Sequence, residues 1–428
     1  MRWQGFPMEE AEAQYRRLLN LSGESLHQWQ QQQRWAVFRH HFENNPYYRS
    51  IVGDKPARWE DVPVLTKSHL QQPIDTLITP PLDKSKVYIN NTSGSSGHPF
   101  FYAKDKMSHA LSWVEIKHLY ALHGLTLRSL QARFYGIPLG GKGYWVEKLK
   151  DRIARRVRFP VFDLSEPVMD RWIERFRRLP FEYVYGYTSS VVRFARHCRR
   201  RGIVLKEVCP TLKVTIVTSE VCTPEDRTIL EEGIGVRVVN EYGASECGLI
   251  GFEDPAGQFR ACERLLYIET VDDEGRPVPL GQSGRVLITA LFNRAMPLIR
   301  YEIGDFAVLD RCDDGGLCIQ QLQGRVNDMI RLPSGRVSPG LTFYYISRSL
   351  LEDAGFIREF IIRQTAIDTF EFVIDAARPL TPEDRAMIQK MMDRYLEPGL
   401  KLVIHEVEKI ERSQSGKIKH FYSEIEAA

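Results

Sequence analysis

The sequence lacks the features that mark membrane, exported and nucleic-acid-binding proteins. It has no uninterrupted apolar run near the ~18 residues that a membrane span requires. Its N-terminus, Met1-Arg2-Trp3-Gln4 followed by acidic residues, has no apolar segment of the kind that directs export. The formal net charge is only +3, which does not indicate binding to nucleic acid. We therefore predict a cytoplasmic protein with no membrane or nucleic-acid partner.

Cysteines are few, and their spacing does not suggest a disulfide framework. The 7 cysteines are scattered along the chain, which fits a reducing compartment. Cys262, Cys312 and Cys318 lie in one region, but Cys312 and Cys318 lack the tight C-x₂₋₄-C spacing of a zinc knuckle. We expect ordinary buried or surface thiols at these positions, with a structural zinc as the alternative.

The commonest phosphate-binding loop is also absent, but a loop of suitable composition is present. His98-Pro99 stands where a Walker loop would need lysine and a hydroxyl residue. Just before it, hydroxyl side chains and glycines gather in one short stretch: Thr92, Ser93, Gly94, Ser95, Ser96 and Gly97. Such a stretch can donate several hydrogen bonds to phosphate, because glycine lets the backbone approach the anion closely. A flexible Ser/Gly turn is the alternative interpretation.

Length and composition predict a globular protein of more than one domain. The chain has 428 residues, of which 43% are hydrophobic and 26% are charged. We predict an N-terminal α/β domain over 1–324, with mixed or parallel sheets, and a compact α+β domain over 325–428. In the second domain the pattern predicts strands over 356–363, 370–374 and 402–405, and a helix from Thr381 to about Leu396.

One strand–helix–strand unit locates a site without further knowledge. A strand is expected over 213–217, then a helix that Thr223 caps and Gly233 ends, then a strand over 236–239. A unit of this length implies parallel strands, and ligands bind at the carboxyl ends of such strands. Residues 218–220 and 240–246 follow two of these ends.

Other helices are expected from composition and spacing. The polar segment 8–44 predicts a helical surface arm, and a helix over 189–201 should end at Gly202. After Leu164, five apolar residues recur on one helical face: Val168, Met169, Trp172, Ile173 and Phe176.

Further motifs follow the Ser/Gly loop in a fixed order. They are Asn240-Glu241-Tyr242-Gly243-Ala244-Ser245-Glu246, Arg300-Tyr301-Glu302-Ile303-Gly304-Asp305, Gly324-Arg325-Val326-Asn327-Asp328-Met329-Ile330 and Ser413-Gln414-Ser415-Gly416-Lys417-Ile418. The series resembles the adenylate-forming superfamily of acyl-CoA synthetases, adenylation domains and luciferases. With Asn45-Pro46-Tyr47-Tyr48 and the segment 61–67, it looks most similar to the phenylacetate–CoA ligase branch and its capsule-biosynthesis relatives.

The resemblance implies an activity. It implies ATP-dependent, Mg²⁺-assisted activation of a carboxylic acid, aryl or arylacetic, to an acyl-adenylate with release of pyrophosphate. The acyl group would then pass to CoA as a thioester. Two alternatives stay open, namely transfer to an amine or carrier protein, and a non-catalytic nucleotide-binding protein on the same fold. Relatives are often homodimers.

The resemblance also assigns nucleotide-binding roles. Residues 92–97 would hold the β- and γ-phosphates. Ser219-Glu220 and Glu241-Tyr242-Gly243 would bracket adenine, and Ser245 would contact the α-phosphate. Glu246 would bind Mg²⁺. Asp305 would accept both ribose hydroxyls, and Arg325 would contact ribose or phosphate.

The remaining roles concern catalysis and the acyl group. Lys417 would reach the α-phosphate during adenylation. The C-terminal domain would be mobile and pivot at Asn327, after which Gly335 would line the passage for the thiol. Tyr135-Gly136, Tyr185 and Tyr187 lie where relatives bind the acid, although aromatic clusters are also ordinary core material.

Overall fold

The computed structural model of the protein describes residues 5–91, 101–135, 148–161, 164–325, 329–335, 337–339, 357–408, 410 and 421–425. The chain divides into two compact units, Met1–Ile303 with Ala307–Gln321, and Gly304–Phe306 with Leu322–Ala428. The predicted boundary after residue 324 falls in strand β13 (Leu317–Arg325).

The larger unit is organised around one wide mixed sheet. Within the described residues its strands lie in the order β10-β11-β12-β13-β9-β8-β7-β6-β5-β3-β4. The bounds are β3 Gln131–Phe134, β4 Arg156–Phe159, β5 Tyr183–Tyr187, β6 Val214–Thr218, β7 Val238–Ala244, β8 Gly248–Glu253, β9 Phe259–Ala261, β10 Leu266–Val271, β11 Ser283–Ala290 and β12 Tyr301–Arg311. Strands β4, β3, β5, β6 and β7 are parallel, whereas β7–β8, β8–β9, β9–β13 and β10–β11 are antiparallel. The predicted mixed α/β fold and the parallel β6–β7 unit are confirmed.

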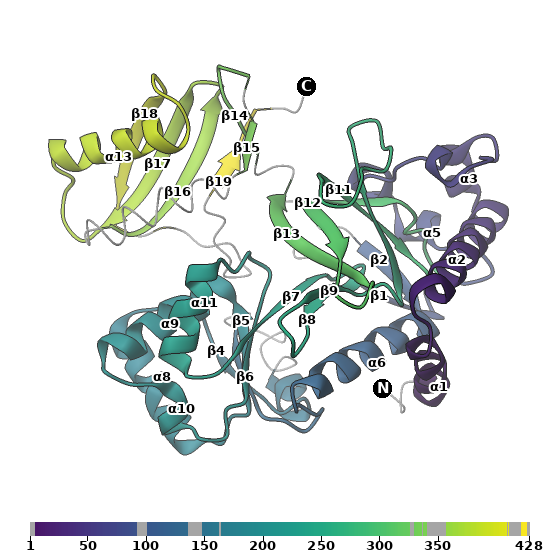
Figure 1. The fold of residues 1–428 in the computed structure, drawn as a ribbon, viewed down its shortest axis with the longest axis horizontal. Coiled ribbons are helices and arrows are strands. Elements are labelled where there is room, and N and C mark those ends of the chain that lie inside the picture. Colours follow the sequence, from purple (N-terminus) through teal and green to yellow (C-terminus); the bar gives the residue numbers. More distant parts are fainter. Residues whose placement is uncertain are drawn as a thin grey trace. The chain divides into compact units, whose positions relative to one another are not determined.

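Helices cover both faces of the parallel strands (Figure 1). On one face lie α8 (Glu166–Arg178), α9 (Thr188–Arg200), α10 (Leu205–Val208) and α11 (Pro224–Ile234), and the predicted apolar face of α8 packs there with Phe134 and Phe159. On the other face α6 (Lys106–Leu122) packs Tyr120 near Tyr183 and Tyr185. None of the helices in the described part of the chain is both long and apolar enough to cross a bilayer.

The N-terminal arm is helical, as predicted, and consists of two helices. Helix α1 covers Met8–Leu19 and α2 covers Gly23–Asn44. Ser22 and Ser25 form reciprocal hydrogen bonds at the start of α2, a capping box that begins a new helix. Three short helices follow, α3 (Pro46–Val52), α4 (Lys67–Leu70) and α5 (Ile74–Leu77).

Helix α11 begins as predicted but ends two residues later. The Thr223 side chain accepts a hydrogen bond from Asp226 N, and Pro224 is the first helical residue. The C-cap is Gly235, whose φ of 80° lies in the left-handed region, so the prediction that Gly233 ends the helix is wrong. Gly233 instead lets α11 approach α9, because a Cβ there would lie 2.5 Å from the backbone oxygen of Ala195.

The smaller unit is an α+β module. Its four-stranded sheet has the order β18-β17-β16-β19, with bounds β16 Ile357–Ala366, β17 Thr369–Ala376, β18 Lys401–Val407 and β19 Phe421–Ser423. Helix α13 (Pro382–Tyr395), capped by Thr381 as predicted, buries Ile388 and Met392 in the same core as Phe370 and Phe372. The short hairpin β14 (Met329–Arg331) and β15 (Val337–Pro339) adds Ile330 to that core.

A buried carboxyl group between α1 and α6 gives a pH-dependent prediction. Glu115 is 3% exposed, and burial raises its pKa from an ordinary 4.5 to about 8. Between these values the folded state holds a proton that the unfolded state has lost, so the free energy of unfolding falls as pH rises. Buried His41 acts in the opposite direction, but only below its ordinary pKa of 6.5, because burial lowers its pKa to about 3.

The window above about pH 6.5 therefore excludes the contribution of His41, and the difference between the native chain and a Glu115 variant reports Glu115. We expect Glu115→Gln to gain about 2 kcal/mol of unfolding free energy relative to the native sequence between about pH 6.5 and 8. Urea unfolding at several pH values would measure this, with exposed Glu10→Gln on α1 as the control. If the free energy of unfolding changed with pH equally in the native chain and in Glu115→Gln, the prediction would be wrong.

Candidate functional site

Several predicted site residues lie outside the described residues: Thr92, Ser93, Gly94, Ser95, Ser96, Gly97, Gly136, Asn327 and Lys417. The predicted phosphate loop joins β1 (Val87–Asn91) to β2 (Phe101–Asp105), and these antiparallel strands place Asn91 opposite Phe101. Arg325 ends β13, but its side chain is outside the described part. Gly335 follows β14 with φ of 83°, a left-handed conformation that favours glycine.

The segment after β6 forms part of the predicted site. Ser219 is exposed and has φ of 71°, which turns the chain sharply away from the strand. The carboxylate of Glu220 accepts hydrogen bonds from Ser189 N at 2.7 Å and from Ser189 Oγ at 3.1 Å. Glu220 therefore caps the first turn of α9, a contact that the sequence did not predict.

The hydroxyl groups of two tyrosines hold the Glu241 side chain. Tyr185 Oη donates to its Oε1 at 2.7 Å, and Tyr120 Oη donates to its Oε2 at 2.8 Å. Burial raises the pKa of Glu241, while Tyr185, Tyr120, Arg133 and Thr218 oppose that rise. The side chain thus belongs to a polar cluster with Tyr185, Tyr120 and Arg133, and its place beside adenine stays a prediction.

The rest of the motif after β7 alternates between buried and exposed positions. The Tyr242 ring is 9% exposed, and Gly243 and Ser245 are exposed. Glu246 is 6% exposed and accepts a hydrogen bond from Tyr301 Oη at 3.2 Å. A hydroxyl at 245 therefore reaches solvent beside a fixed carboxylate at 246.

Three tyrosines predicted for the acyl pocket do come together. The Tyr135 ring lies 5.6 Å from that of Tyr185, nearly parallel at 14°, and 4.1 Å from that of Tyr187. Tyr135 Oη lies 3.4 Å from Ser219 Oγ. The aromatic cluster and the segment after β6 therefore meet at the carboxyl edge of the parallel strands.

Arg133 joins this cluster, and the sequence analysis missed it. Its guanidinium lies over the rings of Tyr135 and Tyr185, with the central carbon 4.3 Å and 4.8 Å from the two centroids. The sequence could have indicated Arg133 because it is a charged residue in the short strand Gln131–Phe134, whose other residues are buried.

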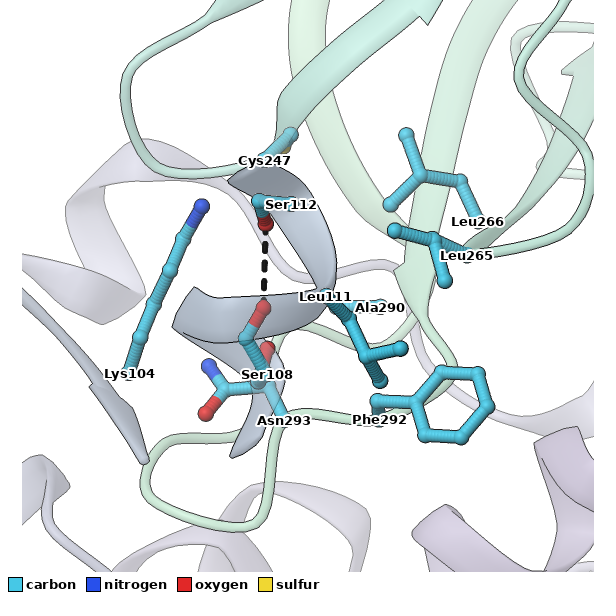
Figure 2. Close-up of a pocket in the computed structure, with 10 residues that line it drawn as sticks. All are labelled: Lys104, Ser108, Leu111, Ser112, Cys247, Leu265, Leu266, Ala290, Phe292 and Asn293. Carbon is cyan, nitrogen blue, oxygen red and sulfur yellow. Dashed lines mark hydrogen bonds between the residues drawn. The ribbon is translucent and has the colours of Figure 1, made fainter. Parts of the chain in front are cut away.

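A small cavity lies close to Glu246 (Figure 2). Figure 2 shows the Lys104 side chain extended toward Ser112 and Cys247, and a hydrogen bond links Ser112 to Ser108. The other lining residues are Leu111, Leu265, Leu266, Ala290, Phe292 and Asn293. Lys104 is 5% exposed, and burial lowers its pKa, although Cys247, Glu246 and Glu115 oppose that shift. A buried amine therefore lies within electrostatic reach of Glu246.

Two of the three cysteines discussed above form a disulfide. Cys312 and Cys318, on either side of the turn between β12 and β13, are bonded to each other. The prediction of ordinary thiols is wrong for this pair, because a hairpin turn can bring sulfurs six positions apart together. Cys262 is a buried free thiol.

Asp305 lies in β12 and is 9% exposed. Gly304 before it has φ of 87°, so the strand backbone turns locally at this acid. The described structure thus gives a largely buried carboxylate at the position predicted to bind ribose.

Comparisons with known proteins found relatives of this chain. The chain is 26% identical over 347 residues to "Phenylacetate-coenzyme A ligase" of Thermus thermophilus, covering 75% of each chain. It is 22% identical over 322 residues to "Protein CapK" of Staphylococcus aureus, covering 70% of this chain and 68% of that one. No family model matches.

A solved structure shares the fold. The 2-hydroxyisobutyryl-CoA ligase in its postadenylation state superposes with a TM-score of 0.68 at 18% identity, over 92% of this chain and 88% of that one. Both the predicted fold and the predicted branch are confirmed. The chain is similar in sequence to the phenylacetate–coenzyme A ligases and to CapK, and it shares the fold of an adenylate-forming coenzyme A ligase.

Proposed function

We propose that the protein uses ATP to activate a carboxylic acid as an acyl-adenylate and then transfers the acyl group to the thiol of coenzyme A. The supporting observation is the meeting of two features at one sheet edge. These are the aromatic cluster of Tyr135, Tyr185 and Tyr187, and the segment after β6 that contains Ser219. The relatives named as coenzyme A ligases support the choice of acceptor.

In the proposed first half-reaction a carboxylate oxygen of the acid attacks the α-phosphorus of ATP. The bond from that phosphorus to the bridging oxygen breaks, and pyrophosphate leaves with the electron pair. Ser245 would donate to an α-phosphate oxygen, and Lys417 would offset the charge that develops there. Tyr242 and the 219–220 segment would hold the base, and residues 92–97 the outer phosphates.

The residues present fit a magnesium ion brought in with the nucleotide. Mg²⁺ is commonly held by one or two carboxylates together with substrate phosphates. Glu246 offers one fixed carboxylate beside exposed Ser245, and the described residues contain no group of three or more His, Cys, Asp or Glu side chains suited to a dedicated protein-only site. When bound, the ion would neutralise phosphate charge, and Glu246 would orient it.

In the proposed second half-reaction the sulfur of coenzyme A attacks the acyl carbonyl. The carbon–oxygen bond to AMP breaks, AMP leaves with the electron pair, and the thiol proton passes to solvent. Asn327 would act as the pivot and Gly335, which is described, would leave room for the thiol. The aromatic rings near Ser219 favour an aryl or arylacetic acid.

The proposal is tested by acid-dependent exchange between ATP and radiolabelled pyrophosphate over a panel of aryl, arylacetic, amino and fatty acids. Exchange with one class would establish adenylation. AMP release that depends on coenzyme A would then separate thioester formation from transfer to an amine or carrier protein. Absence of exchange with every acid would refute the proposed activity.

A substitution at the predicted ribose acid tests nucleotide binding. We expect Asp305→Asn to lower kcat/KM for ATP by about tenfold to a hundredfold, because it removes the charge from hydrogen bonds worth about 1.5–3 kcal/mol each. Exchange rates at varied ATP concentration would measure this. Asp310→Asn in the same strand is the matched control. Equal effects from both substitutions would argue against a ribose contact.

A further inference from the structure

Arg133 carries more hydrogen-bond donors than its surroundings satisfy. Its Nη1 donates to Gln131 Oε1 at 3.3 Å. Its Nε is buried and has no acceptor. Among the described residues no carboxylate forms an ion pair with it. A guanidinium has five N–H donors, and at least the buried Nε donor of Arg133 is unused.

The nearest acid cannot supply the missing acceptors without giving up its own. Glu241 interacts electrostatically with Arg133, but its two oxygens already accept hydrogen bonds from Tyr185 and Tyr120. The cluster therefore leaves the Arg133 Nε donor without an acceptor. A ligand group that accepts hydrogen bonds would satisfy that donor, whereas an ammonium group would not.

Arg133 lies too far back along β3 to contact the reacting end of a bound acid, so it would contact the other end. Tyr135, whose hydroxyl lies near Ser219, follows the end of β3 at the sheet edge. Arg133 is two residues back along the strand and pairs in register with Tyr185. It therefore lies further from the edge than the predicted nucleotide segments, on the side of the sheet that α6 covers.

We infer that Arg133 selects acids with an oxygen acceptor at the end remote from the reacting carboxylate. This rests on the proposed function and narrows it to aryl or arylalkyl acids bearing a ring hydroxyl or second carboxylate. The Tyr135 and Tyr185 rings provide flat walls, and Arg133 provides donors to the substituent. Glu241 accepts a hydrogen bond from Tyr185 and so fixes the ring over which Arg133 lies.

The test compares matched acids in two separate assays. Calorimetry measures binding of phenylacetate, 4-hydroxyphenylacetate and 4-carboxyphenylacetate without nucleotide, and pyrophosphate exchange measures their activation. We expect the native chain to bind at least one substituted acid about tenfold or more tighter than phenylacetate. Tighter binding of 4-hydroxyphenylacetate would show that Arg133 prefers a neutral substituent. Tighter binding of 4-carboxyphenylacetate would show that it prefers an anionic one.

Arg133→Met should remove that preference while leaving phenylacetate binding within about threefold. The matched control is Arg175→Met, an arginine that also lies over a ring, Phe159, but on helix α8 across the sheet. Arg133→Gln, which keeps an N–H₂ donor, should retain part of the preference and serves if Arg133→Met does not fold. Thermal unfolding establishes which variants fold.

The outcomes separate the two proposals. Loss of preference in Arg133→Met but not in Arg175→Met supports the inference. Binding of all three acids with equal affinity, or a preference unchanged in both Arg133 variants, overturns it even if exchange is active. Preferential, Arg133-dependent binding without any exchange would support the inference and refute acid activation.

Discussion

Replacing Arg300 with methionine is expected to lower the free energy of unfolding of the larger unit by about 3–5 kcal/mol. Arg300 is 1% exposed, and its φ of 46° is unusual for a residue other than glycine. Its Nη1 donates to the backbone oxygens of Glu60 and Val62, each at 2.8 Å. Its Nη2 donates to the backbone oxygen of Gly275.

The charge of Arg300 also has a buried partner. Its Nε lies 3.5 Å from Glu269 Oε1, and Trp59 donates to the other Glu269 oxygen at 3.0 Å. Burial raises the pKa of Glu269, and Arg300 opposes that rise. Without the guanidinium, the buried Glu269 carboxyl loses its ion-pair partner and three backbone carbonyl groups lose a donor, which is why the expected cost exceeds that of an ordinary surface pair.

Urea unfolding followed by tryptophan fluorescence would measure the Arg300→Met effect. Arg276→Met is the control, since Arg276 is exposed and pairs with Asp272 and Glu274 at the surface. A surface pair contributes at most about 1 kcal/mol. Similar losses in both variants would mean that the buried network contributes little.

Lys417→Ala is expected to lower the rate of acyl-adenylate formation by about 10²–10³-fold, while ATP binding changes by less than about threefold. The predicted role is contact with the α-phosphate, where charge develops mainly in the transition state. Loss of such a contact lowers kcat more than it raises KM. Lys417 lies outside the described residues, so its motif alone supports this role.

Two measurements make the Lys417 prediction specific. Pyrophosphate exchange reports adenylation, and thioester formation from chemically supplied acyl-adenylate reports the second half-reaction. The second should survive in Lys417→Ala. Lys419→Ala, two residues along, is the matched control. An equal loss in both half-reactions would indicate damage to the smaller unit rather than loss of a contact to phosphate.

Elements whose structure depends on neighbouring residues could be predicted from the sequence. Thr223-Pro224 predicted the start of α11, and the apolar spacing after Leu164 predicted the buried face of α8. The predicted helix end at Gly233 was wrong. A glycine near the end of a helix can either end it or let another helix approach, and the sequence alone does not distinguish the two. The start of α2 was not predicted, although Asn20, Ser22 and Gly23 mark it, because these residue types favour helix ends over helix interiors.

By itself the sequence predicted the fold class and the parallel β6–β7 unit, because residue patterns and chain direction record these. The resemblance to adenylate-forming enzymes suggested that Tyr135, Tyr185 and Tyr187 lie in one region, and ordered motifs carried that resemblance. The tertiary structure alone decided that Glu241 is held by Tyr120, 121 positions away, and that Cys312 pairs with Cys318. It also placed Arg133 over two tyrosine rings without enough acceptors. Hydrogen-bond satisfaction depends on which distant groups share a small volume, and no local pattern records that.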